Sequence, residues 1–108
     1  MAQVIWTEPA LIDLDEVAEY IALDKPSAAK KLVEDIFLRV ELLHQSPNSG
    51  RKPPELERLR YREVIVGPCH IFYRFTNKKV YILYVMRSER KLCNYILTER
   101  NSKHRNMK

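Results

Sequence analysis

Cysteine is scarce in this 108-residue sequence, and long apolar segments are absent. The two cysteines, Cys69 and Cys93, lie well apart, and together with three scattered histidines they show no zinc-binding spacing. We therefore expect no metal site and no cofactor. No apolar run approaches the roughly 20 residues that cross a bilayer as a helix, so no membrane association is expected.

The first ten residues also lack the features of a secretory signal. Met1 to Ala10 contain no basic stretch followed by an apolar segment, so we expect a cytoplasmic protein with reduced cysteines. With 45% hydrophobic and 31% charged residues, a chain of this length is typical of one globular domain. We expect that domain to cover residues 1–94. Residues 95–108 are polar and basic without an apolar stripe, so we expect a partly disordered C-terminal extension.

Acidic residues are scarce in the C-terminal half of the chain. Residues 1–57 contain 6 Lys and Arg against 11 Asp and Glu, whereas residues 58–108 contain 13 against 3. The two parts therefore carry net charges of −5 and +10. A basic half indicates an anionic partner, either nucleic acid or an acidic protein segment, although a solvated surface gives the same composition.

Two helices are predicted in the N-terminal half. The β-prone residues Gln3 to Trp6 predict a short first strand, and Thr7 is a favourable N-cap for a helix that ends near Ala22. Pro26 begins a second helix, which runs to about Gln45. The short connection predicts an antiparallel αα-hairpin. The apolar residues at helical spacing are Leu11, Leu14, Val17, Ala18 and Ile21, then Ala29, Leu32, Val33, Ile36, Phe37, Val40 and Leu43.

Three further strands are predicted in the basic half. Runs rich in Val, Ile, Tyr and Phe cover Tyr61 to Val66, Cys69 to Phe75 and Val80 to Met86. The polar loops Gly67-Pro68 and Thr76-Asn77-Lys78 between them are short enough for hairpins. The sequence therefore predicts an α+β fold in the order β-α-α-β-β-β. Its αα-hairpin packs on one face of a small, mostly antiparallel twisted sheet, because the apolar stripes of the helices need a cover.

This order of elements is accompanied by short motifs spread from Val4 to Leu92. They are Trp6, Asp13-Leu14, Tyr20-Ile21, Pro26 with Ala28-Ala29, Leu42-Leu43 with Ser46-Pro47, Gly50, Gly67, Ile71-Phe72-Tyr73-Arg74, and Val85 through Arg87 to Leu92. Taken together, the motifs and their spacing resemble the RelE/ParE superfamily of bacterial type II toxins.

The resemblance implies a toxin that is inactive while a cognate antitoxin covers the groove between its sheet and helices. It also implies a toxin–antitoxin hetero-oligomer, with a homodimer as another possibility. RelE-type members cleave mRNA on the ribosome without a metal, whereas ParE-type members bind DNA gyrase and stall it. The fold alone does not choose between these two activities.

Metal-independent RNA cleavage needs a general base, a general acid and fixed cations. RelE-like enzymes supply Lys, Arg and Tyr, and other branches use Glu and His. In this sequence the arginine expected three residues after Gly67 is His70, and the one expected past the third strand of the meander is Ser88. The C-terminal tyrosine falls on Asn94, with Tyr95 one place along, and the upstream lysine pair has no counterpart. These departures favour the ParE-like branch, although an alignment shifted by one residue would return Arg87 or Tyr95 to the site.

His70 keeps a nuclease open as the alternative. An imidazole can serve as acid or base near neutral pH, and Glu63 or Glu89 is a possible partner. A packed, hydrogen-bonded histidine at the start of a strand is the other explanation. For the nuclease alternative the expected catalytic residues are His70, Arg74, Arg87 and Arg90.

Basic side chains around the predicted sheet are the expected target contacts. They are Arg60, Arg62, Arg74, Arg87, Arg90 and Lys91, although ion pairs within the fold or simple solvation would also account for them. The sequence thus predicts a ParE-like toxin that inhibits DNA gyrase by binding and uses no catalytic residue. A RelE-like endoribonuclease, with the ribosome and mRNA as partners, and a degenerate, non-toxic family member are the alternatives.

Overall fold

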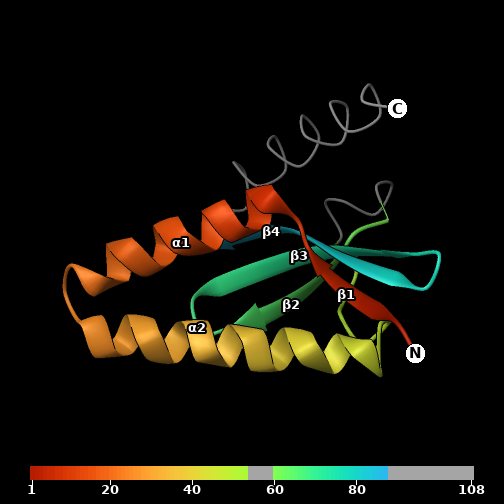
Figure 1. Ribbon diagram of the computed structural model, residues 1–108, viewed down its shortest axis with the longest axis horizontal. Helices are drawn as coiled ribbons and strands as arrows, with labels where there is room; N and C mark the ends of the chain where they lie inside the picture. Colours follow the sequence, from red (N-terminus) through yellow and green to blue (C-terminus); the bar gives the residue numbers. More distant parts are fainter. Residues whose placement is uncertain (54–59, 88–108) are drawn as a thin grey trace.

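The computed structural model describes residues 1–53 and 60–87. In chain order its elements are β1 (Gln3–Trp6), α1 (Glu8–Ala22), α2 (Pro26–Glu41), the 3-10 helix η1 (Leu42–His44), β2 (Arg62–Val66), β3 (Cys69–Thr76) and β4 (Lys79–Arg87). Figure 1 shows α1 and α2 as a pair joined by a tight connection and lying over the sheet. The predicted α+β fold, its element order and its αα-hairpin are confirmed. Within the described residues, neither helix combines the length and apolar character needed to cross a bilayer.

The sheet has four strands in the order β1-β4-β3-β2. β1 runs parallel to β4, while β4, β3 and β2 form an antiparallel meander. Gly67 turns β2 into β3 with a positive φ of 54°. Asn77 and Lys78 turn β3 into β4 with φ values of 50° and 62°, as expected for a two-residue turn that matches the twist of the strands. The hairpin turns predicted from Gly67 and Asn77 are therefore confirmed.

Both helices begin where their residues favour a start. The Thr7 hydroxyl accepts a hydrogen bond from the backbone N–H of Ala10 and donates one of 2.6 Å to the carbonyl of Ile82 in β4. The same side chain therefore caps α1 and fixes it to the sheet. Pro26 begins α2, where its missing N–H would have no helical partner.

The second helix ends earlier as an α-helix than the predicted Gln45. α2 stops at Glu41, and the chain tightens into η1 over the next three residues. Such tightening is common at helix ends, and here it keeps Leu43 fully buried. η1 is held to the start of β1, because the Ala2 N–H donates to the His44 carbonyl at 3.0 Å and His44 Nδ1 lies 2.8 Å from the Ala2 carbonyl.

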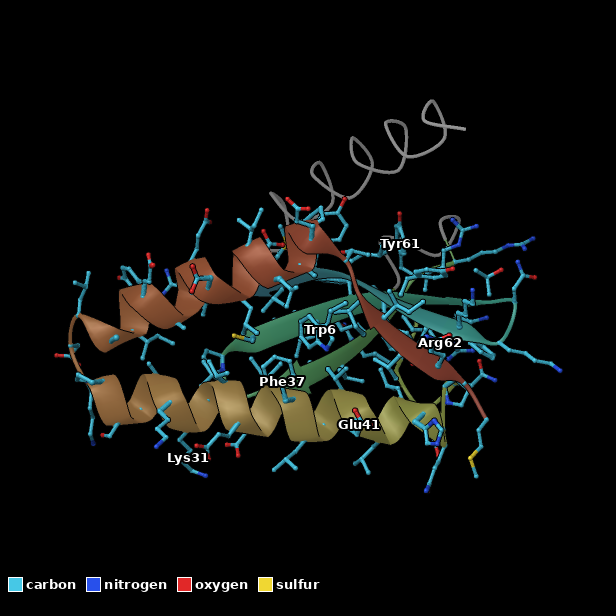
Figure 2. The ribbon with its side chains drawn as sticks, viewed as in Figure 1. Trp6, Lys31, Phe37, Glu41, Tyr61 and Arg62 are labelled. Carbon is cyan, nitrogen blue, oxygen red and sulfur yellow. The ribbon has the colours of Figure 1, made fainter. Side chains whose placement is uncertain are left out.

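The sheet buries side chains on both of its faces. The larger core lies under the helices and combines Leu14, Ile36, Val40 and Leu43 with Val64, Ile71, Tyr73, Val80, Ile82 and Val85 of the strands. Alternation along β3 sends Phe72 to the opposite face, where it forms a separate cluster with Tyr61 and Tyr84. At the edge, Trp6 of β1 packs on Phe37 of α2 with ring centroids 5.0 Å apart (Figure 2).

Candidate functional site

A buried polar network lies on the sheet face that points away from the helices. Glu63 of β2 is 4% exposed, and its two carboxylate oxygens have different partners. Arg51 Nε donates to Oε1 at 2.5 Å, and His70 Nδ1 of β3 lies 2.7 Å from Oε2. The backbones of Arg51 and Glu63 also exchange two hydrogen bonds, of 3.0 and 2.8 Å. Glu63 therefore joins the segment after α2 to two strands of the sheet.

The chemistry of the network follows from its hydrogen bonds. An ionised carboxylate only accepts, so in the ion-paired arrangement with Arg51 the Nδ1–H of His70 donates to Glu63. This fixes the orientation of the imidazole, as a carboxylate does in many acid–base sites. The side chain of His70 is only 11% exposed, however, whereas that of Arg51 is 47% exposed. The arrangement suits a structural role, with the guanidinium of Arg51 presented to solvent.

A second set of hydrogen bonds holds the loop from Pro47 to Arg51. The buried Tyr73 hydroxyl donates to the Pro47 carbonyl at 2.7 Å and accepts from the Gly50 N–H at 2.9 Å. Arg62 Nη1 donates to the carbonyls of Asn48 and Gly50 at 3.1 and 2.8 Å. Gly50 leaves no space for a side chain, because a Cβ would lie 2.6 Å from the Tyr73 hydroxyl oxygen. Tyr73 and Arg62 therefore hold the loop on the helix side of the sheet, while Glu63 holds Arg51 on the opposite side.

The four predicted target-binding residues that the structure describes do not form a single cluster. Arg62 points to the helix side and is engaged with the loop, whereas Arg74 lies on the opposite face, across from Tyr81 in β4. Arg87, at the far end of β4, places its guanidinium 4.1 Å above the ring of Tyr20 in α1. Arg60 is exposed just before β2, in the left-handed backbone region. The structure therefore divides these four residues between two faces and two ends of the sheet.

Several predicted positions cannot be located in the fold. Arg90, Lys91 and the departures at Ser88, Asn94 and Tyr95 lie outside the described residues, as do Cys93, Glu89, His104 and the predicted 95–108 extension. In the described part of the chain, no group of three or more His, Cys, Asp and Glu side chains could hold a metal ion.

Cys69 is the described cysteine, and it is fully buried as a free thiol at the start of β3. Burial raises its pKa above the ordinary value, and the positive charge of Arg87 opposes that shift. The protonated thiol is therefore favoured, and since the thiolate is the reactive form, Cys69 is suited to packing rather than to nucleophilic chemistry.

Sequence reasoning anticipated part of this network and missed the rest. It offered Glu63 as a partner of His70 and also offered hydrogen bonding as the role of His70; the contact is confirmed. It missed Arg51, which lies in a polar, proline-bearing segment, and it missed the anchoring of Gly50 by Tyr73. The usable signal for Arg51 was Glu63 itself, because an acid within an apolar strand needs a cation or donors when buried.

Comparison with known proteins identifies relatives along most of the chain. Residues 4–92 match the family model described as the ParE toxin of the type II toxin–antitoxin system parDE. Toxin RelE2 of Caulobacter vibrioides is 31% identical over 91 residues, which cover 83% of this chain and 99% of that protein. A solved structure described as the chromosomal ParDE toxin–antitoxin system from P. aeruginosa is similar with a TM-score of 0.66 and 30% identity, covering 82% of this chain and 98% of the other.

Replacing Gly50 by Ala should destabilise the fold. The new methyl group would lie 2.6 and 2.7 Å from Tyr73 Oη and Cε1 and 2.9 Å from the Glu63 carbonyl oxygen, so the loop must move. We expect the free energy of unfolding, measured by urea denaturation, to fall by about 2 kcal/mol. The cost should be smaller in a Tyr73→Phe background, which removes one clashing atom. The neighbouring Ser49→Ala is the control, and an equal effect of the two substitutions would contradict the packing described here.

The Tyr73 phenol should make the protein sensitive to alkali. Burial raises its pKa above the ordinary value of 10.0, while the Gly50 N–H and the charges of Arg62 and Arg39 oppose the shift. Since the folded state favours the neutral phenol, this contribution to stability is fully present below about pH 10 and is lost as pH rises through the folded-state pKa. Urea denaturation between pH 8 and 11 should show a steeper loss of stability for the wild type than for Tyr73→Phe. Tyr20→Phe, which removes an exposed phenol, should behave as the wild type.

Proposed function

The chain belongs to the ParE toxin family of type II toxin–antitoxin systems, and from this membership we propose that it inhibits DNA gyrase by binding and is neutralised by a cognate antitoxin. We further propose that it acts in the cytoplasm, where gyrase and DNA are found. Arg60, Arg62, Arg74 and Arg87 are the proposed target contacts among the described residues, with Arg90 and Lys91 completing the set.

The observation that supports binding over catalysis is the separation of the candidate catalytic groups. His70 and Arg74 lie on one face of the sheet, whereas Arg87 lies on the helix side against Tyr20. A general acid or base contributes about 10² to 10⁴ in rate only when it reaches the reacting atoms. A protein that acts by binding does not need its functional groups to meet at one point, and its basic side chains can contact the target from different faces.

A RelE-like, ribosome-dependent endoribonuclease is the second candidate. It is favoured by the hydrogen bond between His70 and Glu63, which holds an imidazole in one orientation beside a carboxylate. Arg74 would then be its cation on the same face, with Arg87 and Arg90 as further candidates. A member that retains the fold and the antitoxin contact without toxicity is the third, and induced expression without growth arrest would identify it.

The gyrase proposal predicts that purified toxin blocks supercoiling by gyrase and traps cleaved DNA. Arg74 is half-buried and has no hydrogen bond or ion pair with another side chain in the ranges 1–53 and 60–87, so Arg74→Ala should preserve the fold. If it is a principal contact, its loss should cost about 2 kcal/mol, or roughly 30-fold in inhibitory concentration. Lys31→Ala on the exposed face of α2 is the control and should change little. A wild-type toxin with no effect on supercoiling would rule out gyrase as the target.

The ribonuclease candidate predicts cleavage of transcripts on translating ribosomes, lost in His70→Ala. We expect no cleavage by the wild type. His44→Ala removes another half-buried imidazole outside the network and is the matched control. Cleavage that survives in His44→Ala and disappears in His70→Ala would replace the gyrase proposal with the nuclease.

A further inference from the structure

Five cationic side chains lie around the outer edge of β2 and the loop that precedes it. We call them the basic corner: Arg39, Arg51, Lys52, Arg60 and Arg62. Arg51 is placed beside β2 by its two backbone hydrogen bonds to Glu63, and Arg62 is the neighbour of Glu63 in the strand. Arg39 of α2 lies close enough to act, together with Arg62, on the pKa of Tyr73. Figure 2 shows Arg62 at the end of the molecule where α2 finishes.

The guanidinium groups of Arg51 and Arg62 in the basic corner are each held by hydrogen bonds to the protein. Glu63 Oε1 accepts a hydrogen bond from Nε of Arg51. Two loop carbonyls accept hydrogen bonds from Nη1 of Arg62. An arginine side chain carries about 2 kcal/mol of rotamer entropy, and a group already fixed in place loses less of it on binding a ligand. The basic corner is thus pre-organised to bind anions.

Among the residues that the structure describes, the charge of the basic corner is only partly balanced; Glu55 and Glu57 lie outside them. Glu63, the carboxylate that binds Arg51, is 4% exposed, and its second oxygen is occupied by His70. It positions the guanidinium but presents almost no negative surface to solvent. Lys52 and Arg60 are exposed, and the side chain of Arg51 is 47% exposed. Positive charge therefore reaches solvent on both sides of the β2 edge.

The surroundings of the basic corner indicate the kind of anion. Protein partners are usually bound around an apolar or aromatic centre. The exposed apolar side chains in the described ranges lie mainly along the two helices and their connection, as Leu11, Ile12, Tyr20, Leu23 and Phe37, while Leu38, Leu42 and Ile65 are the nearest to the basic corner along the chain. Surfaces that bind phosphate backbones are more polar and much more positive. The basic corner has this second character.

We propose that the basic corner binds the phosphate backbone of duplex DNA. This proposal rests on the proposed gyrase function. The DNA is then the segment bound by gyrase, and the toxin contacts both gyrase and its DNA. The contact is to phosphates and carries no sequence preference. Arg51 and Arg62 supply fixed guanidinium groups, while Lys52 and Arg60 supply mobile charges at the margin.

The test measures DNA binding by the full-length toxin in the absence of gyrase. The probe is a fluorescent 20-base-pair duplex, and anisotropy gives Kd across a series of salt concentrations. The key variant is Lys52→Gln with Arg60→Gln, because both side chains are exposed and neither anchors the loop. The matched control, Lys30→Gln with Lys31→Gln, removes the same charge from the exposed face of α2.

The wild type should bind with an affinity that falls steeply with salt. Each lost phosphate contact lowers the slope of log K against log salt by about 0.9, so the key variant should lower it by about 1.8 and raise Kd roughly tenfold at moderate salt. The control should retain the wild-type slope. Absence of salt-dependent binding by the wild type, or equal losses in the two variants, would overturn the proposal.

Two competition experiments, one with single-stranded RNA and one with an acidic peptide, test for other partners. Preference for single-stranded RNA of the same length would overturn the DNA proposal and favour the nuclease. Displacement by an acidic peptide, with no binding to duplex, would assign the basic corner to a protein. Supercoiling assays on the same preparations separate the two proposals: DNA binding without gyrase inhibition rejects the gyrase target alone, and inhibition by a toxin that does not bind DNA rejects the DNA contact alone.

Discussion

The arrangement of the β2 edge depends on one buried carboxylate. An ionised Glu63 at 4% exposure would be strongly unfavourable without partners, because desolvation of a charge is compensated only by paired charges and hydrogen bonds. Arg51 and His70 provide them from the preceding loop and the neighbouring strand. The chain after η1 must therefore return to β2, and the register of β2 against β3 must place Glu63 beside His70.

On the helix side of the β2 edge, the preceding loop is fixed by the uncharged Tyr73 phenol and by the Arg62 guanidinium. Tyr73 and Arg62 satisfy loop donors and acceptors that would otherwise be buried without partners, and Gly50 allows the phenol to approach the backbone closely. The two networks act on adjacent residues of one loop from opposite faces of the sheet. A short polar segment thereby becomes a rigid part of the domain, and the arginines attached to it acquire fixed positions.

The fold was predictable because its signals are local. Thr7, Pro26, Gly67 and Asn77 mark starts and turns through their own backbone preferences, and the apolar period of α2 extends over four turns. The site was less predictable because its partners are distant: Glu63 meets a residue twelve positions earlier and another seven later. Counting charges placed the excess of positive charge in residues 58–108, whereas Arg39, Arg51 and Lys52 of the basic corner come from residues 1–57. The face of each arginine depends on strand alternation and on contacts such as that of Arg87 with Tyr20.

Arginine serves two purposes in this chain, and the distinction bears on how a small toxin can act. A guanidinium has five donors in a rigid plane, so one edge can satisfy buried acceptors while the other remains available. Arg51 and Arg62 are bonded in this way, whereas the guanidinium of Arg87 lies over an aromatic ring. The groups that stabilise the domain are thus also suited to contact a partner. Since His70 and Arg74 lie on one face of the sheet and Arg87 on the other, this 108-residue protein presents cations on several sides, an arrangement that suits contact with a partner better than it suits bond cleavage at one point.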